Sequence, residues 1–177
     1  MSEKMEHYYE KQFTEFIDES FPLNTEELSK LNTNFRHLRT RKRFRTGDEI
    51  ISGVEYVSHL GAGKDGHQIK IRINGNLYAV KFYHSTVQKD EVDIINYLLT
   101  NSCKGIPKVY VLQENILITE FINGRYPYDW NDSKITDKLK QSLNEASLFI
   151  FDDNYKNFIL NESGAYYVDF QGLRKLN

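Results

Sequence analysis

The hydrophobic pattern changes at about Val54, from helical spacing before that residue to alternation after it. In "EHYYEKQFTEFIDESF" apolar side chains recur three and four residues apart. This spacing predicts one buried face of an α-helix. The members of this face are Tyr9, Phe13, Phe16 and Ile17.

A second helix is predicted to open at "NTEELSKL". Asn24 precedes Glu27 by three residues, and this pairing is typical of a capping box, in which each side chain accepts a hydrogen bond from the other residue's backbone N–H. Two short helices followed by a basic segment therefore form the N-terminal part that the pattern predicts.

After Val54 the pattern predicts strands. "QIKIRI" and "LYAVKFY" flank Asn74-Gly75, and Asn-Gly between alternating segments is the strongest short signal for an antiparallel hairpin. The further elements predicted are a helix over 86–101, a strand pair at 108–113 and 115–122, a helix over 133–151 with Ile135, Leu139, Leu143, Ala146 and Ile150 on one side, and a small hairpin from 157–161 and 165–170.

The composition predicts one compact unit. The chain has 177 residues, 40% hydrophobic and 27% charged, with a formal charge of −2, and these values are typical of a soluble globular protein. No apolar run reaches the ~20 residues of a membrane span, and no secretory signal opens the chain. We therefore expect a cytoplasmic protein, although a dedicated secretion system could export it as an effector. Cys103 is the sole cysteine, so a buried, inert thiol is expected.

Positive charge gathers in "RHLRTRKRFR", Arg36 to Arg45, which holds six of the 23 lysines and arginines. Such a segment could meet phosphate, an acidic partner or an anionic membrane surface. The favoured interpretation is a solvated basic face that pairs with acidic groups of the protein itself. A nucleic-acid partner is not expected.

"LGAGKDG", Leu60 to Gly66, has the G-x-G-x-x-G pattern. A dinucleotide-binding turn would need a helix directly after the glycines, but a strand, a turn and another strand follow. A Walker A loop is excluded because Lys64 precedes Asp65 and the G-x-x-x-x-G-K spacing is missing. The remaining interpretation is a glycine loop between antiparallel strands, whose backbone N–H groups could approach phosphate oxygens.

Lys81 lies within the apolar strand that follows. Alternation places it on one face with Leu77, Ala79 and Tyr83, beside room for a nucleotide base. A lysine at the margin of a half-exposed sheet is the competing interpretation.

Glu91 falls within an apolar stripe of the next predicted helix, among Val87, Ile94, Ile95 and Leu98. A carboxylate on such a face is costly unless a cation meets it. Lys81 is the natural candidate, while a glutamate at the rim of the core is the alternative.

Three oxygen-bearing side chains lie near the C-terminus. Asp152 and Asn157 are five residues apart in "DDNYKN", and Asp169 ends a hydrophobic strand. Phosphoryl transfer from a metal nucleotide needs oxygen ligands for Mg²⁺ and a carboxylate that orients the attacking hydroxyl. Each residue also has a turn explanation, but together and in this order they favour that chemistry.

In order, over about Val54 to Gly172, these motifs resemble the protein-kinase-like superfamily. "AVK" looks like the A-x-K of the third strand, "NILITEFING" like the strand and hinge that bind adenine, and "VDFQG" like the D-F-G region. The resemblance implies an α+β two-lobe fold with an antiparallel-sheet N-lobe, one main helix and a minimal C-lobe. It divides the chain into an extension (1–50), N-lobe and hinge (51–124) and C-lobe (125–177).

The same resemblance implies the cofactors ATP and Mg²⁺, with Mn²⁺ as a substitute. The implied roles are catalysis by Asp152, Lys81 and Glu91; nucleotide binding by Leu60, Gly61, Ala62, Gly63, Gly66, Ala79, Lys81, Glu120 and Ile122; and metal binding by Asn157 and Asp169.

The chain departs from the family pattern at several positions. Ile150 and Phe151 replace the His-Arg before the catalytic aspartate, Asn154 replaces a lysine, and Gln171 interrupts D-F-G. Gln68 replaces the valine over the adenine. With little chain given after D-F-G, the sequence resembles the miniature bacterial serine/threonine kinases, and a protein substrate is expected. A small-molecule kinase, a nucleotide-binding pseudokinase or scaffold, and a nucleotidyl transferase remain alternatives.

Overall fold

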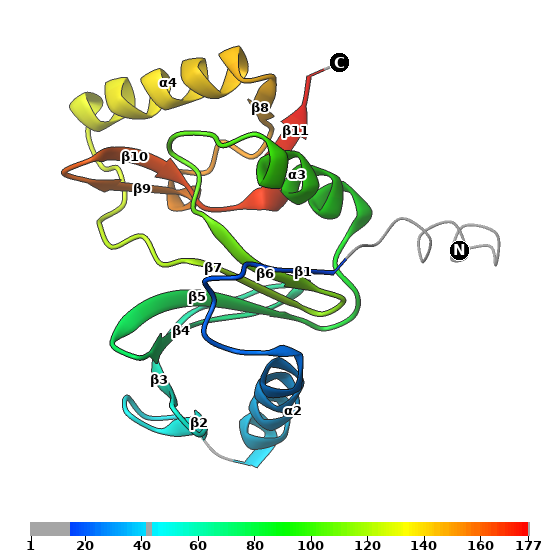
Figure 1. Cartoon of the computed structure of the whole chain (residues 1–177). Helices are drawn as coiled ribbons and strands as arrows, with labels where there is room; N and C mark the ends of the chain where they lie inside the picture. The colour runs from blue at the N-terminus through cyan, green and yellow to red at the C-terminus, as the bar shows by residue number, and fades with distance from the viewer. Residues whose placement is uncertain (1–14, 42–43, 177) are drawn as a thin grey trace. The chain divides into compact units, whose positions relative to one another are not determined.

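The computed structural model describes residues 15–41 and 44–176 of the chain. Within these residues the fold is α+β, as predicted, and every strand pair is antiparallel. In chain order the helices and strands (Figure 1) are β1 (Phe16–Ile17), α2 (Thr25–Arg41), β2 (Glu49–Ile51), β3 (Val54–Ala62), β4 (Gly66–Ile73), β5 (Asn76–Tyr83), α3 (Lys89–Thr100), β6 (Val109–Gln113), β7 (Ile116–Glu120), α4 (Trp130–Glu145), β8 (Leu148–Ile150), η1 (Tyr155–Asn157), β9 (Phe158–Asn161), β10 (Gly164–Tyr167), η2 (Phe170–Gly172) and β11 (Leu173–Lys175).

Contacts along the chain divide it into two compact units. The first unit comprises Met1–Val87 with Val109–Phe121, and the second comprises Gln88–Lys108 with Ile122–Asn177. The first contains α2 and a seven-stranded sheet in the order β1-β6-β7-β5-β4-β3-β2. The second contains α3, α4 and the pairs β9–β10 and β8–β11. The predicted boundaries near residues 50 and 124 stay a prediction.

The predicted Asn-Gly hairpin is confirmed as β4–β5. Asn74 has φ 49° and Gly75 has φ 82°, and two successive positive φ angles are what a type I′ hairpin turn requires. Ile73 then pairs with Asn76 across the turn. The second predicted strand pair is also present, as β6–β7.

The predicted capping box opens α2. The backbone N–H of Glu27 donates to Asn24 Oδ1 at 3.0 Å, and the N–H of Asn24 donates to Glu27 Oε2 at 2.9 Å. Two amides that no helical carbonyl can reach are thus satisfied by side chains, which fixes where the helix begins.

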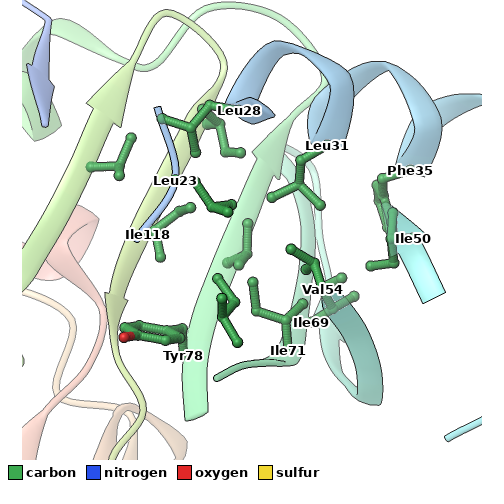
Figure 2. Close-up of a cluster of buried hydrophobic side chains, with 14 of the residues drawn as sticks. Leu23, Leu28, Leu31, Phe35, Ile50, Val54, Ile69, Ile71, Tyr78 and Ile118 are labelled. Atoms are coloured by element: carbon green, nitrogen blue, oxygen red, sulfur yellow. The ribbon is translucent and has the colours of Figure 1, made fainter. Parts of the chain in front are cut away.

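Helix α2 covers one face of the seven-stranded sheet and forms the core of the first unit with it (Figure 2). Leu28 and Leu31 are completely buried, and Phe35 stacks on Phe82 of β5 with ring centroids 4.1 Å apart. The sheet contributes the alternate, core-facing residues of its central strands. These are Ile69, Ile71, Tyr78, Val80, Phe82, Ile116 and Ile118, among others.

The helix predicted over "EHYYEKQFTEFIDESF" is wrong where the structure describes it. Phe16 and Ile17 form β1 and pair with Leu112 and Val111 of β6. Pairing with a sheet edge satisfies backbone groups that a short isolated helix would satisfy only marginally. Tyr9 and Phe13 lie outside the described residues.

The basic segment begins inside α2, and its first residue, Arg36, forms hydrogen bonds within the first unit. The Arg36 guanidinium donates to the backbone carbonyl of Tyr83 and, through Nε, to Asn32 Oδ1 at 2.8 Å. Phe44, also in the segment, lies between the rings of Phe35 and Tyr56. These contacts tie part of the segment to the unit's own core.

In the second unit the helix predicted over 133–151 has different ends. The Asp129 side chain accepts from Asp132 N at 2.9 Å and caps a helix that starts at Trp130. At the other end the chain reverses at Ser147, with φ 58°, and Leu148–Ile150 becomes β8, paired with β11. The predicted end was wrong because a helical apolar spacing also suits a short buried strand.

The other two predicted elements of the second unit are present with different ends. Helix α3 runs over Lys89–Thr100, and β9 pairs with β10 as a small hairpin. Strand β10 ends at Tyr167, so Asp169 does not end the strand as predicted but caps η2. Cys103 is partly buried, which raises the pKa of its thiol. Among the described helices none has the length and apolarity that crossing a bilayer requires.

A bidentate ion pair holds the start of α4. Both guanidinium nitrogens of Arg125 donate to the Asp132 carboxylate, at 2.6 and 2.8 Å, and the Tyr128 backbone N–H adds a third bond at 2.9 Å. The Arg125 hydrogen bonds, followed by that of Tyr128, lower the pKa of Asp132 from 3.8 to about 2.

Asp132 should therefore make the free energy of unfolding depend on pH in acid. Its folded pKa is depressed, so the unfolded chain takes up the proton first, and the stabilisation present above about pH 4 is lost as the pH falls to about 2. In Asp132→Asn, urea unfolding followed by circular dichroism should give a shallower fall over that interval. Asp93→Asn, at an exposed site on α3, is the control. Equal slopes in all three proteins would contradict this.

Candidate functional site

The glycine loop joins β3 to β4 in the first unit, as predicted. The backbone N–H of Gly63 donates to Gly66 O at 3.0 Å, and Asp65 O accepts from His84 N at 2.9 Å, which ties the loop to the end of β5. A Cβ added to Gly61 or Gly63 would meet nothing within 4 Å. Within residues 15–41 and 44–176, no packing requires glycine at these two positions, and their backbone is open on that side.

Gly66 differs from the other two glycines. A Cβ at this position would overlap the backbone carbonyl of Phe82. Strand β4 pairs with β5 here, Gly66 opposite Tyr83, so this glycine permits close backbone packing. Leu60 and Ala62, which flank the loop glycines on β3, are exposed.

Lys81 lies on the face of the sheet opposite α2. It is partly buried, while its strand neighbours Val80 and Phe82 point into the core. Its Nζ lies 4.6 Å from the centroid of the Tyr83 ring, and its cross-strand neighbours are Gln68 and Leu117. The predicted alternation is therefore confirmed.

Ala79 precedes Lys81 on the same face. Its cross-strand neighbours are Lys70 and Thr119. The predicted room for a nucleotide base beside Lys81 stays a prediction. Glu120 ends β7 with its side chain exposed, and its contact with a base stays a prediction.

Glu91 and Ile122 belong to the second unit. Glu91 lies in the first turn of α3 and is only 1% exposed, and Ile94 and Ile95 of the predicted stripe are buried with it. Of the other predicted members, Val87 precedes the helix and Leu98 is only partly buried. Every buried side-chain nitrogen or oxygen of the described residues has a hydrogen-bond partner, as a buried carboxylate needs. The ion pair with Lys81 stays a prediction. Ile122 is buried.

The structure brings the loops of Asp152, Asn157 and Asp169 together within the second unit. The Asn157 side-chain amide donates to Asp152 O at 3.4 Å, and the backbone N–H of Val168 donates to Asn157 O at 2.9 Å. Asp169 follows directly and caps η2 by accepting from Gln171 N at 3.2 Å. These three residues lie within 17 positions of one another in the sequence and belong to one short hydrogen-bond network.

Asp152 also contacts the end of the chain segment that follows Asp169. The backbone amides of Phe151 and Asp152 donate to Gly172 O, at 2.7 and 3.4 Å. The Asp152 carboxylate accepts a 3.2 Å hydrogen bond from Asn154 N, and the side chain is exposed. Its loop is therefore fixed by the backbone while its carboxylate faces solvent.

Tyr167 was missed by the sequence analysis and lies at the centre of this network. It is completely buried, and its hydroxyl donates to Asp152 O at 2.7 Å. Burial, and next the negative charge of Asp169, raise the pKa of this hydroxyl, so it stays a donor. The available signal was its place on β10, two residues before Asp169, on the inward side of an alternating strand.

Oxygen donors of the right kind for Mg²⁺ are present in this network. Asn157 offers an amide oxygen and Asp169 a carboxylate. Mg²⁺ prefers such hard oxygen ligands. It usually takes only one or two carboxylates from the protein and completes its coordination shell with phosphate oxygens and water. The chemistry of the two side chains therefore fits the implied cation. When bound, it would neutralise charge on the nucleotide phosphates.

An open pocket of about 440 Å³ lies elsewhere in the second unit. Its lining is mainly apolar and was not among the predicted site residues. It consists of Gly124, Arg125, Ile135, Leu160, Asn161, Glu162 and Gly164. Near it in the sequence, Tyr126, Tyr128 and Trp130 are 50–78% exposed.

Comparisons with known proteins leave the family resemblance without independent support. A scan against protein-family models and a search of curated proteins each found no match to this chain.

Proposed function

We propose that this protein is an ATP- and Mg²⁺-dependent phosphotransferase that moves the γ-phosphoryl group to a serine or threonine hydroxyl of a protein. The observation that carries the proposal is the network joining Asp152, Asn157 and Asp169 through backbone and side-chain hydrogen bonds. The separate turn explanation of each residue does not account for their meeting.

In this proposal each side chain has a distinct role. Asn157 and Asp169 hold Mg²⁺, and Asp152 orients the acceptor hydroxyl and accepts its proton as the bond to phosphorus forms and the bond to the leaving oxygen of ADP breaks. In the first unit, Lys81 contacts the α- and β-phosphates. The open backbone at Gly61 and Gly63 admits phosphate oxygens. Most of the catalysis is then positioning and charge stabilisation.

Exposed aromatic side chains support a protein acceptor over a small molecule. Tyr155, within the candidate catalytic loop, is 55% exposed and contacts Tyr126, with ring centroids 6.4 Å apart. Phe151, next to Asp152, is 69% exposed. Clustered exposed apolar groups mark surfaces that bind other proteins.

A nucleotide-binding pseudokinase is the second candidate, favoured by Asn154. Its side chain accepts from Lys156 N at 3.0 Å and caps η1. This residue, at the place of a family lysine, therefore serves the turn. Nucleotide binding without turnover under any divalent metal would support this candidate.

The test uses the full-length protein, Mg²⁺ and ATP labelled on either the γ- or the α-phosphate, with a cell lysate as acceptor mixture. The proposal expects γ-label on protein and no α-label, and intact-mass analysis of the modified protein should show the mass of a phosphoryl group. Asp169→Ala should abolish transfer. Labelling that is unchanged in Asp169→Ala, or transfer of the α-label, would refute it.

A further inference from the structure

The segment that carries Asp152 and Asn157, between β8 and β9, contacts one buried hydroxyl. Tyr167 Oη donates to the backbone carbonyl of Asp152 at 2.7 Å, and the Asn157 side-chain amide donates to the same carbonyl at 3.4 Å. The amide nitrogen of Asn157 is thus directed to the Asp152 carbonyl, and the amide oxygen, which can only accept, lies on the other arm of the side chain.

The surroundings of this hydroxyl are fitted to it. A Cβ at Gly172 would overlap Tyr167 Oη and would lie 3.2 Å from Asp152 Cβ. Gly172 therefore lets the phenol, the Asp152 loop and the segment after Asp169 approach one another closely. The Tyr167 ring itself packs edge-on against Phe158, at 5.1 Å between centroids.

The residues just before Asp152 provide no comparable anchor. Ile150 and Phe151 have no polar side-chain atoms, and Phe151 is 69% exposed. Within the described network Tyr167 is the side chain that donates to the Asp152 backbone through a buried hydroxyl. A buried hydrogen bond of this kind costs more to break than an exposed one, because water does not replace the lost partner.

We propose that Tyr167 is a positioning residue of the phosphotransferase. It holds the Asp152 loop through the Asp152 carbonyl, which also accepts from the Asn157 amide, and so orients the Asn157 oxygen toward the metal. This inference rests on the proposed function. It assigns the role to the hydroxyl and not to the ring. Groups that orient a metal ligand in this way typically change metal affinity or activity 10- to 100-fold when removed.

The test compares Tyr167→Phe, which removes only the hydroxyl and keeps the packing on Phe158, with Tyr166→Phe, which removes a hydroxyl from the adjacent residue of β10. Binding of Mn²⁺ in the presence of a non-hydrolysable ATP analogue is measured by electron paramagnetic resonance. Tyr167→Phe should bind Mn²⁺ about 10- to 100-fold more weakly. Its kcat should fall with little change in the KM for acceptor, and Tyr166→Phe should match the parent.

A second variant tests the same role in case Tyr167→Phe fails to fold, which circular dichroism would reveal. Gly172→Ala keeps every polar group but crowds the same hydroxyl, and the same weakening of Mn²⁺ binding is expected.

The outcomes separate this inference from the proposed function. A parent protein that binds Mn²⁺ and nucleotide and transfers phosphate, with Tyr167→Phe equal to it, overturns the positioning role alone. A parent protein that neither binds nor transfers overturns the proposed function and this inference with it.

Discussion

Asp152→Asn is expected to lower ATP-dependent phosphoryl transfer on the order of a hundred- to a thousandfold, the range found when one preorganised catalytic group is removed. The amide keeps the size of the side chain but cannot accept the proton of the acceptor hydroxyl. Because the loop is fixed by the backbone bonds of Phe151 and Asp152 to Gly172, the fold should be preserved. Initial rates with saturating ATP and acceptor measure the effect.

The adjacent aspartate provides a matched control. Asp153 Oδ2 accepts from Lys140 Nζ of α4 at 2.8 Å, so its carboxylate is engaged in a surface ion pair, which contributes little to stability. Asp153→Asn should retain the parent rate within about twofold, since it removes no group from the Asp152 network. Equal losses in the two variants would contradict the assignment of Asp152 and would indicate a general effect on the loop.

The features that the sequence predicted well are those with local causes. Asn74-Gly75 specifies its turn because both residues must adopt positive φ, and Asn24 and Glu27 specify a helix start because their side chains reach each other's amides. Asp152 and Asn157, five residues apart, are likewise joined by a local contact, because the Asn157 side-chain amide donates to Asp152 O. Such signals depend on residues within about five positions.

The features that the sequence predicted poorly depend on residues far away along the chain. Phe16 and Ile17 have helical spacing with their neighbours, but the edge of β6, almost a hundred residues later, pairs with them as a strand. The end of α4 was misplaced because β11 pairs with Leu148–Ile150. Tyr167 was missed because a tyrosine in an apolar strand resembles any core aromatic until its hydroxyl is seen to reach Asp152 O.

Leu31→Ala in α2 is expected to lower the free energy of unfolding of the first unit by about 2–5 kcal/mol, as for other fully buried leucines. Leu31 is 0% exposed and lies among the core side chains over the sheet (Figure 2). Alanine favours the helix at least as well as leucine does, so the loss comes from packing. Strand β5, which carries Lys81, depends on this core.

Two measurements localise the effect. Urea unfolding followed by circular dichroism gives the free energy, and hydrogen exchange of peptides from β4 and β5 reports the first unit. Ser29→Ala, on the exposed side of the same helix, is the matched control and should change stability by less than about 0.5 kcal/mol.

Under the proposed function, Leu31→Ala should also weaken nucleotide binding, although Leu31 is not among the residues assigned to the nucleotide. If β5 opens more often, the fraction of molecules able to bind falls, and the apparent Kd rises by the same factor. Added nucleotide should in turn raise the unfolding midpoint of the variant, because a ligand that binds only the folded state stabilises it. Unchanged exchange in β4 and β5 together with unchanged stability would show that α2 is dispensable to the sheet, and that the core in Figure 2 does not hold Lys81 in place.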